Sequence, residues 1–518
     1  MSNKVAKNVG IILACSIAAK VLAYLWEMTL AALLGASDQA DAYYMIGSIT
    51  EILYPILDLG IWKVFLPAYK AKLVKGSESS ANRIANIATT FFFCLSVGLV
   101  LFLIVFSKQL VLLIAPGFSP EKKALAAHFL RLAAPAYFLM ASCSVIGAIL
   151  QSHDRFIGSQ IREIGTHVSK IAFLLICYRF LGIYAAVFAM VVGSVFRLLI
   201  QLPFINWNWK FRPDFHFKDP EIVPMIKGLP SVALTAAIQH INSLIDRTIA
   251  SGSASGSIAC LNYGARLTHV FSGMVSTALG TASYPTMIQY IAQKREDKLR
   301  ELIGNVLGAL SFIIIPISVF CIVFSRQIVT VAFQRGAFDA AATQLTAKVF
   351  AGYCIGLLFT GAATIVSNIF YGYGDTKITL RISELNILLN IVFNLIFVRI
   401  WGVPGLAIAT SLSAIICLIV RLFCLKRFLV MDYRPLVREN LKLLLLAVVS
   451  VTAAFLLFER VLRIHVYISL FCSFAVAAGL FLVLCMLLRI KAMTDAWHMI
   501  KARLPGRKRD GNKGEGGE

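Results

Sequence analysis

Charged residues are scarce in this sequence. Asp, Glu, Lys and Arg make up 14% of its 518 residues, whereas 59% are apolar and the mean hydropathy is +0.80. In a soluble domain about one quarter of the residues are charged. The shortage of charge therefore excludes a soluble globular enzyme and an intrinsically disordered chain.

Paired cysteines and catalytic motifs are also missing. The 11 cysteines lie almost entirely in apolar stretches and form no Cys-x-x-Cys pair, which excludes a disulfide scaffold and predicts small core residues. The sequence has no P-loop, no His-Glu-x-x-His motif and no Gly-x-Ser-x-Gly motif. We therefore expect neither an enzyme nor a resident metal or cofactor.

What the sequence does contain is a series of apolar stretches, each about twenty residues long, which is the length of a helix that crosses a bilayer. This pattern predicts an all-α polytopic membrane protein with about fourteen transmembrane helices. Their approximate limits are 9–34, 39–69, 85–107, 122–150, 157–178, 181–203, 222–250, 257–291, 301–325, 340–371, 376–398, 403–425, 440–458 and 465–488. The first stretch has no small-residue cleavage site and is predicted to be a span, not a signal peptide.

Lys and Arg gather in alternate loops. The loops 70–83, 294–300 and 421–442 are rich in them, whereas the loops 35–40 and 251–257 contain none. Because Lys and Arg collect in cytoplasmic loops, we predict that both termini are cytoplasmic. The same bias explains the net charge of +23 without a nucleic-acid partner.

Two segments are too polar to cross the bilayer. The segment 204–220 is rich in aromatic residues and is predicted to be an interfacial linker, with Trp207 and Trp209 at headgroup level. Stacking of these tryptophans on a sugar is the alternative. The segment 491–518 is predicted to be a basic cytoplasmic tail that contacts anionic lipid.

The two halves of the chain resemble one another at an offset of about 220 residues. Phe118 aligns with Phe338 in similar loops, and Arg179 aligns with Arg399 just before a helix. A constant offset across most of each half predicts two copies of one six-helix unit. Because six is an even number, both copies insert in the same orientation.

The repeat divides the chain into an N-terminal lobe, 1–203, and a C-terminal lobe, 221–426. Two extra helices follow in 427–490. Parallel repeats related by an axis along the membrane normal, with a cleft between them, are typical of alternating-access transporters. An ion channel fits this organisation less well.

Charges within the spans are unevenly distributed. A charge at the bilayer centre costs about 2.5–3.5 kcal/mol on insertion scales, so such residues are functional candidates. Most of them lie in helices 1, 2, 7 and 8, which the repeat makes equivalent, and we predict that they converge on the cleft. The predicted substrate-binding residues are Lys20, Glu27, Asp41, Glu51, Asp246, Arg247, Asn262 and Arg266.

Each of these residues also has a structural interpretation. Arg266 is the strongest candidate because a guanidinium is always charged and binds a phosphate or carboxylate bidentately. An ion pair with Glu27 or Asp246 is the alternative for Arg266. Lys20 and Glu27 are seven residues apart on one helix face, and a buried polar pair explains them as well as substrate binding does. For Asp41 the structural alternative is a capping group.

Five segments carry a resemblance to a known family. They are GASDQADAYY (35–44), APGFSPEKKALAAHFLRLAAPAYFLMASCSVIGAILQSHDRF (115–156), SGSIACLNYGARL (255–267), STALGTASYP (276–285) and FQRGAFD (333–339). They resemble segments of the MviN/MurJ lipid II flippases of the multidrug/oligosaccharidyl-lipid/polysaccharide exporter superfamily. Fourteen helices, as two lobes and a terminal pair, are more similar to this family than to the twelve-helix drug antiporters.

The resemblance implies transfer of an undecaprenyl-pyrophosphate-linked sugar from the cytoplasmic to the outer leaflet of the bacterial inner membrane. It implies that cations on helices 1, 2 and 8 hold the pyrophosphate and that helices 13 and 14 form a groove for the lipid tail. Lys20, Asp41 and Arg266 fall on matching positions, with Glu27 on an acidic one. A coupling ion (Na+ or H+) or the membrane potential is expected to supply energy. Membrane lipid and cell-wall synthases are the expected partners.

The sequence departs from the family at several cavity positions. Trp26 stands where well-studied members have a second arginine in helix 1. Tyr54 and Pro55 stand in place of paired arginines in helix 2, and Ala265 stands in place of the acid before the helix 8 arginine. Arg247 is an additional charge. The smaller cationic charge favours, as the alternative, an exporter of O-antigen or exopolysaccharide repeat units. A cation-coupled drug antiporter and a non-transporting cell-wall scaffold are less favoured.

Overall fold

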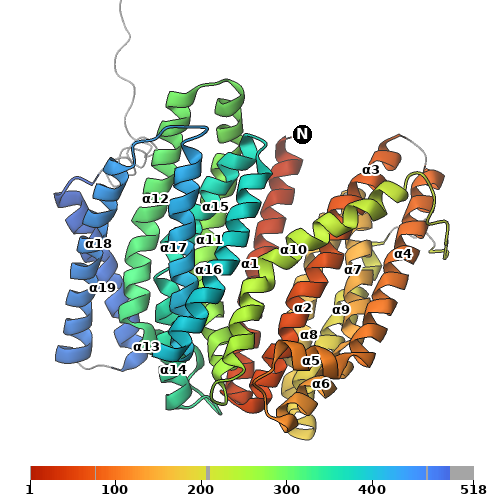
Figure 1. Ribbon diagram of the computed structural model, residues 1–518, viewed down its shortest axis with the longest axis horizontal. Coiled ribbons are helices and arrows are strands. Elements are labelled where there is room, and N and C mark those ends of the chain that lie inside the picture. Colours follow the sequence, from red (N-terminus) through yellow and green to blue (C-terminus); the bar gives the residue numbers. More distant parts are fainter. Residues whose placement is uncertain (1, 76–77, 206–210, 463–464, 491–518) are drawn as a thin grey trace, which may run out of the picture. The chain divides into compact units, whose positions relative to one another are not determined.

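The computed structural model describes residues 2–75, 78–205, 211–462 and 465–490, and every regular element within these ranges is a helix (Figure 1). The elements in chain order are α1 (Ser2–Leu34), α2 (Asp38–Gly60), the π-helix η1 (Ile61–Phe65), α3 (Leu66–Val74), α4 (Glu78–Val105), α5 (Ser107–Ile114), α6 (Pro120–Ala133), α7 (Pro135–Ser152), α8 (Phe156–Leu181), α9 (Ile183–Leu199), the 3-10 helix η2 (Leu202–Phe204), α10 (Val223–Ala250), α11 (Ser257–Ala292), α12 (Glu296–Val323), α13 (Ser325–Phe333), α14 (Ala340–Cys354), α15 (Leu357–Gly372), α16 (Thr376–Trp401), α17 (Val403–Leu425), α18 (Arg434–Phe455), the π-helix η3 (Leu456–Leu462) and α19 (Val466–Leu487).

The all-α membrane fold predicted from the sequence is confirmed. Among the described residues, 11 helical segments are long and apolar enough to cross a bilayer. The three other predicted spans, 39–69, 222–250 and 257–291, are also helical, as α2 with η1 and α3, as α10 and as α11. A total of fourteen spans is consistent with these helices. The three that are less apolar hold most of the predicted site residues.

Several helices continue through segments predicted to be loops. In the predicted loop 70–83, α3 ends only at Val74 and α4 begins already at Glu78. Lys, Glu and Arg are good helix formers, so a helix need not stop where the hydrocarbon stops. The predicted span 122–150 is instead divided into α6 and α7, with Pro135 at the first position of α7, where proline is tolerated.

The helix limits repeat at the offset found in the sequence. α8 begins at Phe156 and α16 at Thr376, which lies 220 residues later, and both helices contain 26 residues. Gly182 follows α8 and Gly402 follows α16, and both glycines have a positive φ. In each case the next helix begins at the residue after the glycine. The internal repeat therefore extends to the positions of turns. The lobe boundaries and membrane orientation stay predictions.

By their contacts, the residues divide into two compact units. The first comprises Met1–Thr268, Ile328–Tyr353 and Leu380–Ser413, and within it α8 packs on α9, α1 on α8, and α10 along α2. The second comprises His269–Gln327, Cys354–Thr379 and the chain from Ala414 onward, and within it α12 packs against α15, α18 and α19. All the side chains of the candidate site lie in the first unit.

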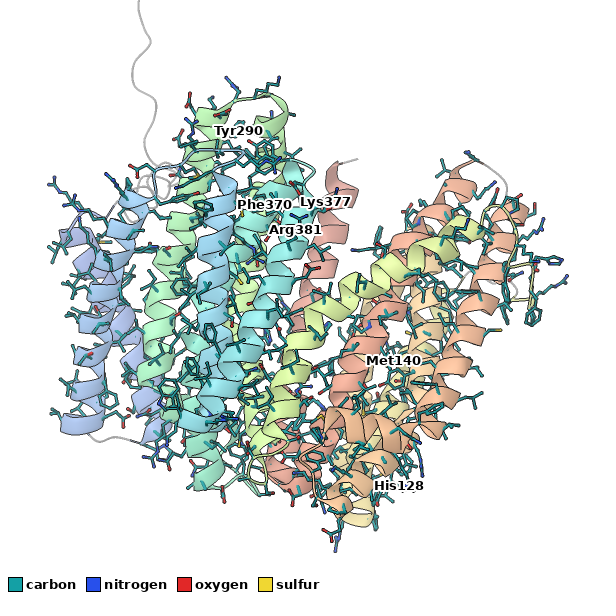
Figure 2. All side chains as sticks on the ribbon, in the orientation of Figure 1. His128, Met140, Tyr290, Phe370, Lys377 and Arg381 are labelled. Carbon is teal, nitrogen blue, oxygen red and sulfur yellow. The ribbon has the colours of Figure 1, made fainter. Side chains whose placement is uncertain are left out.

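Within the second unit, Tyr290 near the end of α11, Phe370 near the end of α15 and Lys377 near the start of α16 lie toward the same end of the unit (Figure 2). The loops that follow α11 and α15 are both predicted to be cytoplasmic. Their common end therefore agrees with the predicted alternation of spans.

The described part of the predicted linker runs along α4. The Arg212 amide donates to Asn86 Oδ1 at 3.3 Å, and the Asp214 amide donates to Thr90 Oγ1 at 3.0 Å. A pocket of about 470 Å³ lies between these segments and contains none of the predicted site residues. Trp207, Trp209 and the tail 491–518 lie outside the described residues.

Candidate functional site

Four helices bring the charged residues of the spans together. Glu27 comes from α1, Glu51 from α2, Arg247 from α10, and Arg266 from α11. We call these four residues, with Tyr44, Ser48 and Asn262, the charge cluster. It joins five of the eight predicted site residues, which are Glu27, Glu51, Arg247, Asn262 and Arg266.

Glu51 is the centre of the charge cluster. Its Oε2 lies 2.9 Å from Arg247 Nη1, and its Oε1 lies 2.7 Å from Arg266 Nη2. One carboxylate therefore pairs with two guanidinium groups from different helices. Each oxygen faces one guanidinium, which is the short, charge-assisted geometry that compensates for removal from water.

Glu27 supplies the second negative charge. Its Oε2 accepts hydrogen bonds from the Tyr44 hydroxyl at 2.8 Å and from Asn262 Nδ2 at 3.4 Å, and its Oε1 lies 3.4 Å from Arg266 Nε. Arg247 in turn donates to Ser48 Oγ at 2.6 Å and to Asn262 Oδ1 at 3.1 Å. Neutral side chains thus complete the hydrogen bonding of the ions.

The four charges of the cluster sum to zero, but they are not equally accessible. The Arg247 side chain is 6% exposed, whereas the Arg266 side chain is 44% exposed. Arg266 also interacts with Glu51 and Glu27 rather than with Asp246. A ligand anion would therefore reach Arg266 first and would compete there with carboxylates that are already present.

Asp41 lies in a separate group of contacts. Its Oδ2 lies 2.7 Å from Lys122 Nζ and accepts the Gly256 amide at 2.9 Å, and its Oδ1 accepts the Ala259 amide at 2.8 Å. Both amides belong to the start of α11, where backbone N–H groups lack intrahelical partners and favour a negative charge. Asp38 also binds Lys122. The capping interpretation of Asp41 describes this geometry.

Close backbone contacts surround the Asp41 group. The Ala337 amide donates to the Ala32 carbonyl at 2.8 Å, and the Gly117 amide donates to Ser251 Oγ at 3.1 Å. At Gly35, Gly117 and Gly256 a Cβ would overlap the backbone of a neighbouring loop, and at Gly336 it would overlap the backbone at the end of α1. The four loops that join spans 1 to 2, 3 to 4, 7 to 8 and 9 to 10 are thus packed backbone to backbone.

Asp246 belongs to a third group, which contains only neutral partners. Its Oδ1 accepts from Asn394 Nδ2 at 2.6 Å and its Oδ2 accepts from Thr410 Oγ1 at 3.1 Å, while Asn390 bonds to both Asn394 and Thr410. The Asn394 Oδ1 atom is buried without a partner. Within the described ranges, Asp246 forms no ion pair. Two side-chain donors thus satisfy the buried Asp246 carboxylate.

Lys20 is the one predicted site residue that joins none of these groups. Its side chain is exposed on α1 and forms no ion pair or hydrogen bond with another residue that the structure describes. Glu27, two turns further along α1, is buried and bonded elsewhere. Lys20 and Glu27 therefore do not pair in this conformation.

Sequence reasoning missed several residues of these groups. Lys122 lies outside the apolar part of its span, and Tyr44, Ser48 and Thr410 are common types in any helix. Asn390 and Asn394 carried a usable signal, because two amides four residues apart in an apolar helix share one face. Lys170, a single charge in the middle of α8, is not among the predicted site residues.

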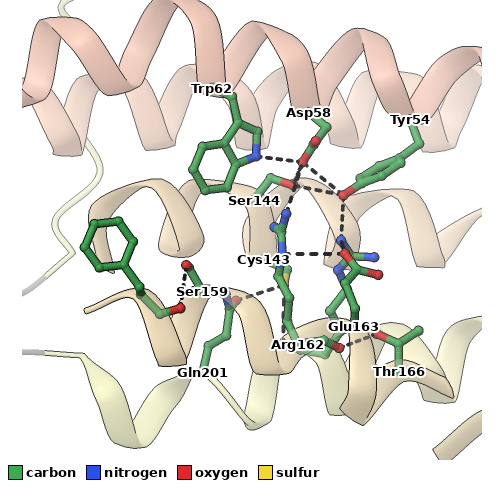
Figure 3. A network of polar contacts seen from close by, with 12 residues as sticks. Tyr54, Asp58, Trp62, Cys143, Ser144, Ser159, Arg162, Glu163, Thr166 and Gln201 are labelled. Carbon is green, nitrogen blue, oxygen red and sulfur yellow. Dashed lines mark hydrogen bonds and ion pairs between the residues drawn. The ribbon is translucent and has the colours of Figure 1, made fainter. Parts of the chain in front are cut away.

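A fourth polar group connects helices of the predicted N-terminal lobe (Figure 3). Asp58 Oδ1 accepts from the Tyr54 hydroxyl at 3.0 Å and from Trp62 Nε1 at 3.1 Å, and Arg197 Nη2 lies 2.5 Å from Glu163 Oε1. Arg197 also donates to the Tyr54 hydroxyl at 2.8 Å. These contacts join α2 and η1 to α8 and α9, so Tyr54 takes part in interhelical packing.

Comparison with known proteins gives a consistent family. The sequence model of the lipid II flippase MurJ family matches residues 30–476. A probable lipid II flippase MurJ of Buchnera aphidicola subsp. Baizongia pistaciae is 27% identical over 420 residues, which are 79% of this chain and 82% of the relative. Its counterpart in Helicobacter pylori is 27% identical over 409 residues, which are 74% and 87% of the two chains.

Solved structures show the same fold. A lipid II flippase MurJ in an inward closed conformation matches with a TM-score of 0.79 at 19% identity, covering 95% of this chain and 99% of that one. An inward-facing multidrug resistance MATE family transporter of the MOP superfamily matches with a TM-score of 0.67 at 16% identity, covering 79% and 94%.

Proposed function

The chain belongs to the lipid II flippase MurJ family, and from this premise we propose that it moves lipid II from the cytoplasmic to the outer leaflet by alternating access. The pyrophosphate and sugars of such a lipid cannot cross about 30 Å of hydrocarbon unaided. The observation that carries the proposal is the charge cluster, which presents a half-exposed guanidinium, Arg266, in helices of the membrane.

Arg266 is proposed to be the first pyrophosphate ligand. A pyrophosphate oxygen would take the place of Glu51 on Arg266, while Arg247 keeps its pair with Glu51. The Arg266 guanidinium is paired with an oxygen anion before and after this exchange, so it is not left unpaired in the membrane. Lys20, exposed on α1, is proposed to join the headgroup from the same face as Glu27.

The backbone contacts around Asp41 support the alternating-access step. In this conformation Asp41, Lys122 and the four loop glycines hold one end of the first unit closed. Because the opposite loops carry the positive charge, we propose that the closed end lies on the outer side and that these contacts separate when the headgroup is released. The polyprenyl tail is proposed to lie on α18 and α19, which expose Leu445 and Phe471.

The energy source is proposed to act through Asp246. A carboxylate buried among Asn390, Asn394 and Thr410 without a basic partner would hold either Na+ or a proton. A membrane potential adds about 2.3 kcal/mol per charge for each 100 mV. We further propose a bacterial cytoplasmic membrane location, cytoplasmic termini and contact with cell-wall synthases.

Rescue of a bacterium whose own lipid II flippase can be switched off tests the proposed function. We expect the wild-type chain to support growth and Arg266→Gln to abolish it, because loss of charge-assisted hydrogen bonds worth about 1.5–3 kcal/mol weakens headgroup binding at least tenfold. Arg381→Gln, an exposed arginine on α16 (Figure 2), is the matched control and should grow normally.

Two outcomes would contradict this proposal. Growth of the Arg266→Gln strain at the wild-type rate would remove Arg266 from the binding site. Failure of a well-expressed, membrane-inserted wild-type chain would favour another undecaprenyl-linked glycan, such as an O-antigen or exopolysaccharide repeat unit. Membrane-inserted protein is quantified in each strain, so that poor expression is recognised.

A further inference from the structure

Lys170 is a charged residue of α8 that forms no ion pair with any other residue that the structure describes. Its ammonium lies over the ring of Trp26, with Nζ 4.2 Å from the ring centroid. In the part of the chain that the structure describes, Lys170 has no carboxylate within ion-pair distance and no hydrogen-bond acceptor. A cation over a tryptophan face is stabilised by the ring quadrupole, but this offsets only part of the cost of leaving water.

The surrounding helices make room for this lysine. A Cβ on Gly193 of α9 would lie 2.5 Å from Lys170 Cγ and 2.9 Å from Lys170 Cδ, so a larger residue at position 193 would displace the lysine stem. Trp26 is 4% exposed and provides a fixed platform for the ammonium. The Lys170 ammonium is therefore held at a defined place.

That place adjoins the charge cluster. Trp26 directly precedes Glu27, whose carboxylate contacts Arg266, and the charges of both Glu27 and Arg266 act on the Lys170 ammonium. The two arginines of the cluster are already neutralised by two glutamates, whereas Lys170 has no carboxylate partner among the described residues. An anion that approaches Arg266 therefore also meets the cation of Lys170 on α8, the helix that packs on α1.

We propose that the Lys170 ammonium is a further ligand of the lipid-linked pyrophosphate and rests on Trp26 until the headgroup arrives. This inference rests on the proposed function, and it names Lys170 as the source of the positive charge that the balanced charge cluster does not offer the headgroup. The four-carbon stem lets the ammonium leave the ring and reach a phosphate oxygen without movement of α8. The cation–π contact then breaks and a charge-assisted hydrogen bond forms.

Four variants separate the charge of Lys170 from its packing. Lys170→Met keeps the stem on Trp26 and removes the charge, and Lys170→Arg keeps the charge. The double variant Trp26→Arg with Lys170→Met returns a cation to the same place from α1. Lys348→Met removes an exposed lysine from α14 that has no described ion-pair partner, and it serves as the matched control.

The measurements are the Kd of the purified full-length protein for lipid II, its thermal unfolding temperature, and growth rescue. We expect Lys170→Met to weaken lipid II binding about tenfold or more without lowering the unfolding temperature. Lys170→Arg and the double variant should bind within about threefold of wild type, and Lys348→Met should be unchanged.

The proposal would be overturned if Lys170→Met bound lipid II within about twofold of wild type. It would equally be overturned if affinity and unfolding temperature fell together and the double variant restored neither, because the role would then be structural. In both cases the wild-type chain still binds lipid II and supports growth, so the proposed function stands. A wild-type chain that neither binds nor rescues would overturn both proposals.

Discussion

At the scale of single residues, the charge cluster is a balanced set of ions. Glu27 and Glu51 neutralise Arg247 and Arg266, so these four residues together carry no net charge in the unloaded protein. An unpaired guanidinium there would be costly to carry through a conformational change. The balance lowers the free-energy cost of returning the empty transporter to its starting conformation. The half-exposed Arg266 meanwhile stays available to an anion.

Lys122 gives a residue-scale prediction. Lys122→Met leaves the Asp41 carboxylate, which is 1% exposed, without its cation, and we expect a loss of about 3–5 kcal/mol because a buried charge is left unpaired. Thermal unfolding of the detergent-purified protein measures this loss. Lys123→Met is the control, since among the described residues the Lys123 ammonium bonds to the Pro116 carbonyl alone. Equal unfolding temperatures for the two variants would contradict the prediction.

At the scale of elements, the loop contacts reproduce the internal repeat. Gly35 lies between spans 1 and 2, and Gly256 lies between the equivalent spans 7 and 8. Gly117 and Gly336 lie in the two similar loops that first indicated the repeat. Each glycine allows one loop backbone to touch another, so closure of this end depends on the absence of four Cβ atoms.

Gly336→Ala is therefore expected to separate these loops. The new Cβ would overlap the Ala32 carbonyl, so the hydrogen bond from the Ala337 amide to that carbonyl should weaken. Hydrogen exchange at the amides of Ala337, Gly256 and Ala259 should become at least tenfold faster, as expected for a local loss of about 1.4 kcal/mol. Gly182→Ala is the control, because Gly182 has the same positive φ but open space around it. Identical exchange of these three amides in the two variants would show that the overlap at position 336 does not separate the loops, and it would contradict the prediction.

The elements also show what the sequence could predict. Hydropathy located the helices because a span must be apolar along its length. It also identified the candidate site residues, because charged residues are rare within apolar spans. It could not assign partners, since Glu51 and Arg266 are 215 residues apart and their pairing depends on helix packing. Lys122 was hidden for a different reason, because a lysine near a helix end is ordinarily solvated.

At the scale of the whole molecule, the distribution of basic residues predicts sidedness. With both termini cytoplasmic, a fluorescent protein fused after Glu518 should be bright, and alkaline phosphatase inserted after Ala254 should be active. The loop 251–257 that receives the phosphatase contains no Lys or Arg. Inactive phosphatase in a stably inserted fusion would contradict the predicted orientation. The glycine loops would then be closed on the cytoplasmic side.

The low apolarity of three helices has a consequence for how this protein is made. α2, α10 and α11 bring most of the site residues together, and none is among the 11 segments that qualify as spans by themselves. A nascent helix that the lipid phase accepts poorly needs an already inserted neighbour to shield its polar face during synthesis. Biogenesis therefore depends on flanking helices such as α1 and α9, and a substitution in those helices can deplete the protein from the membrane without touching the transport machinery.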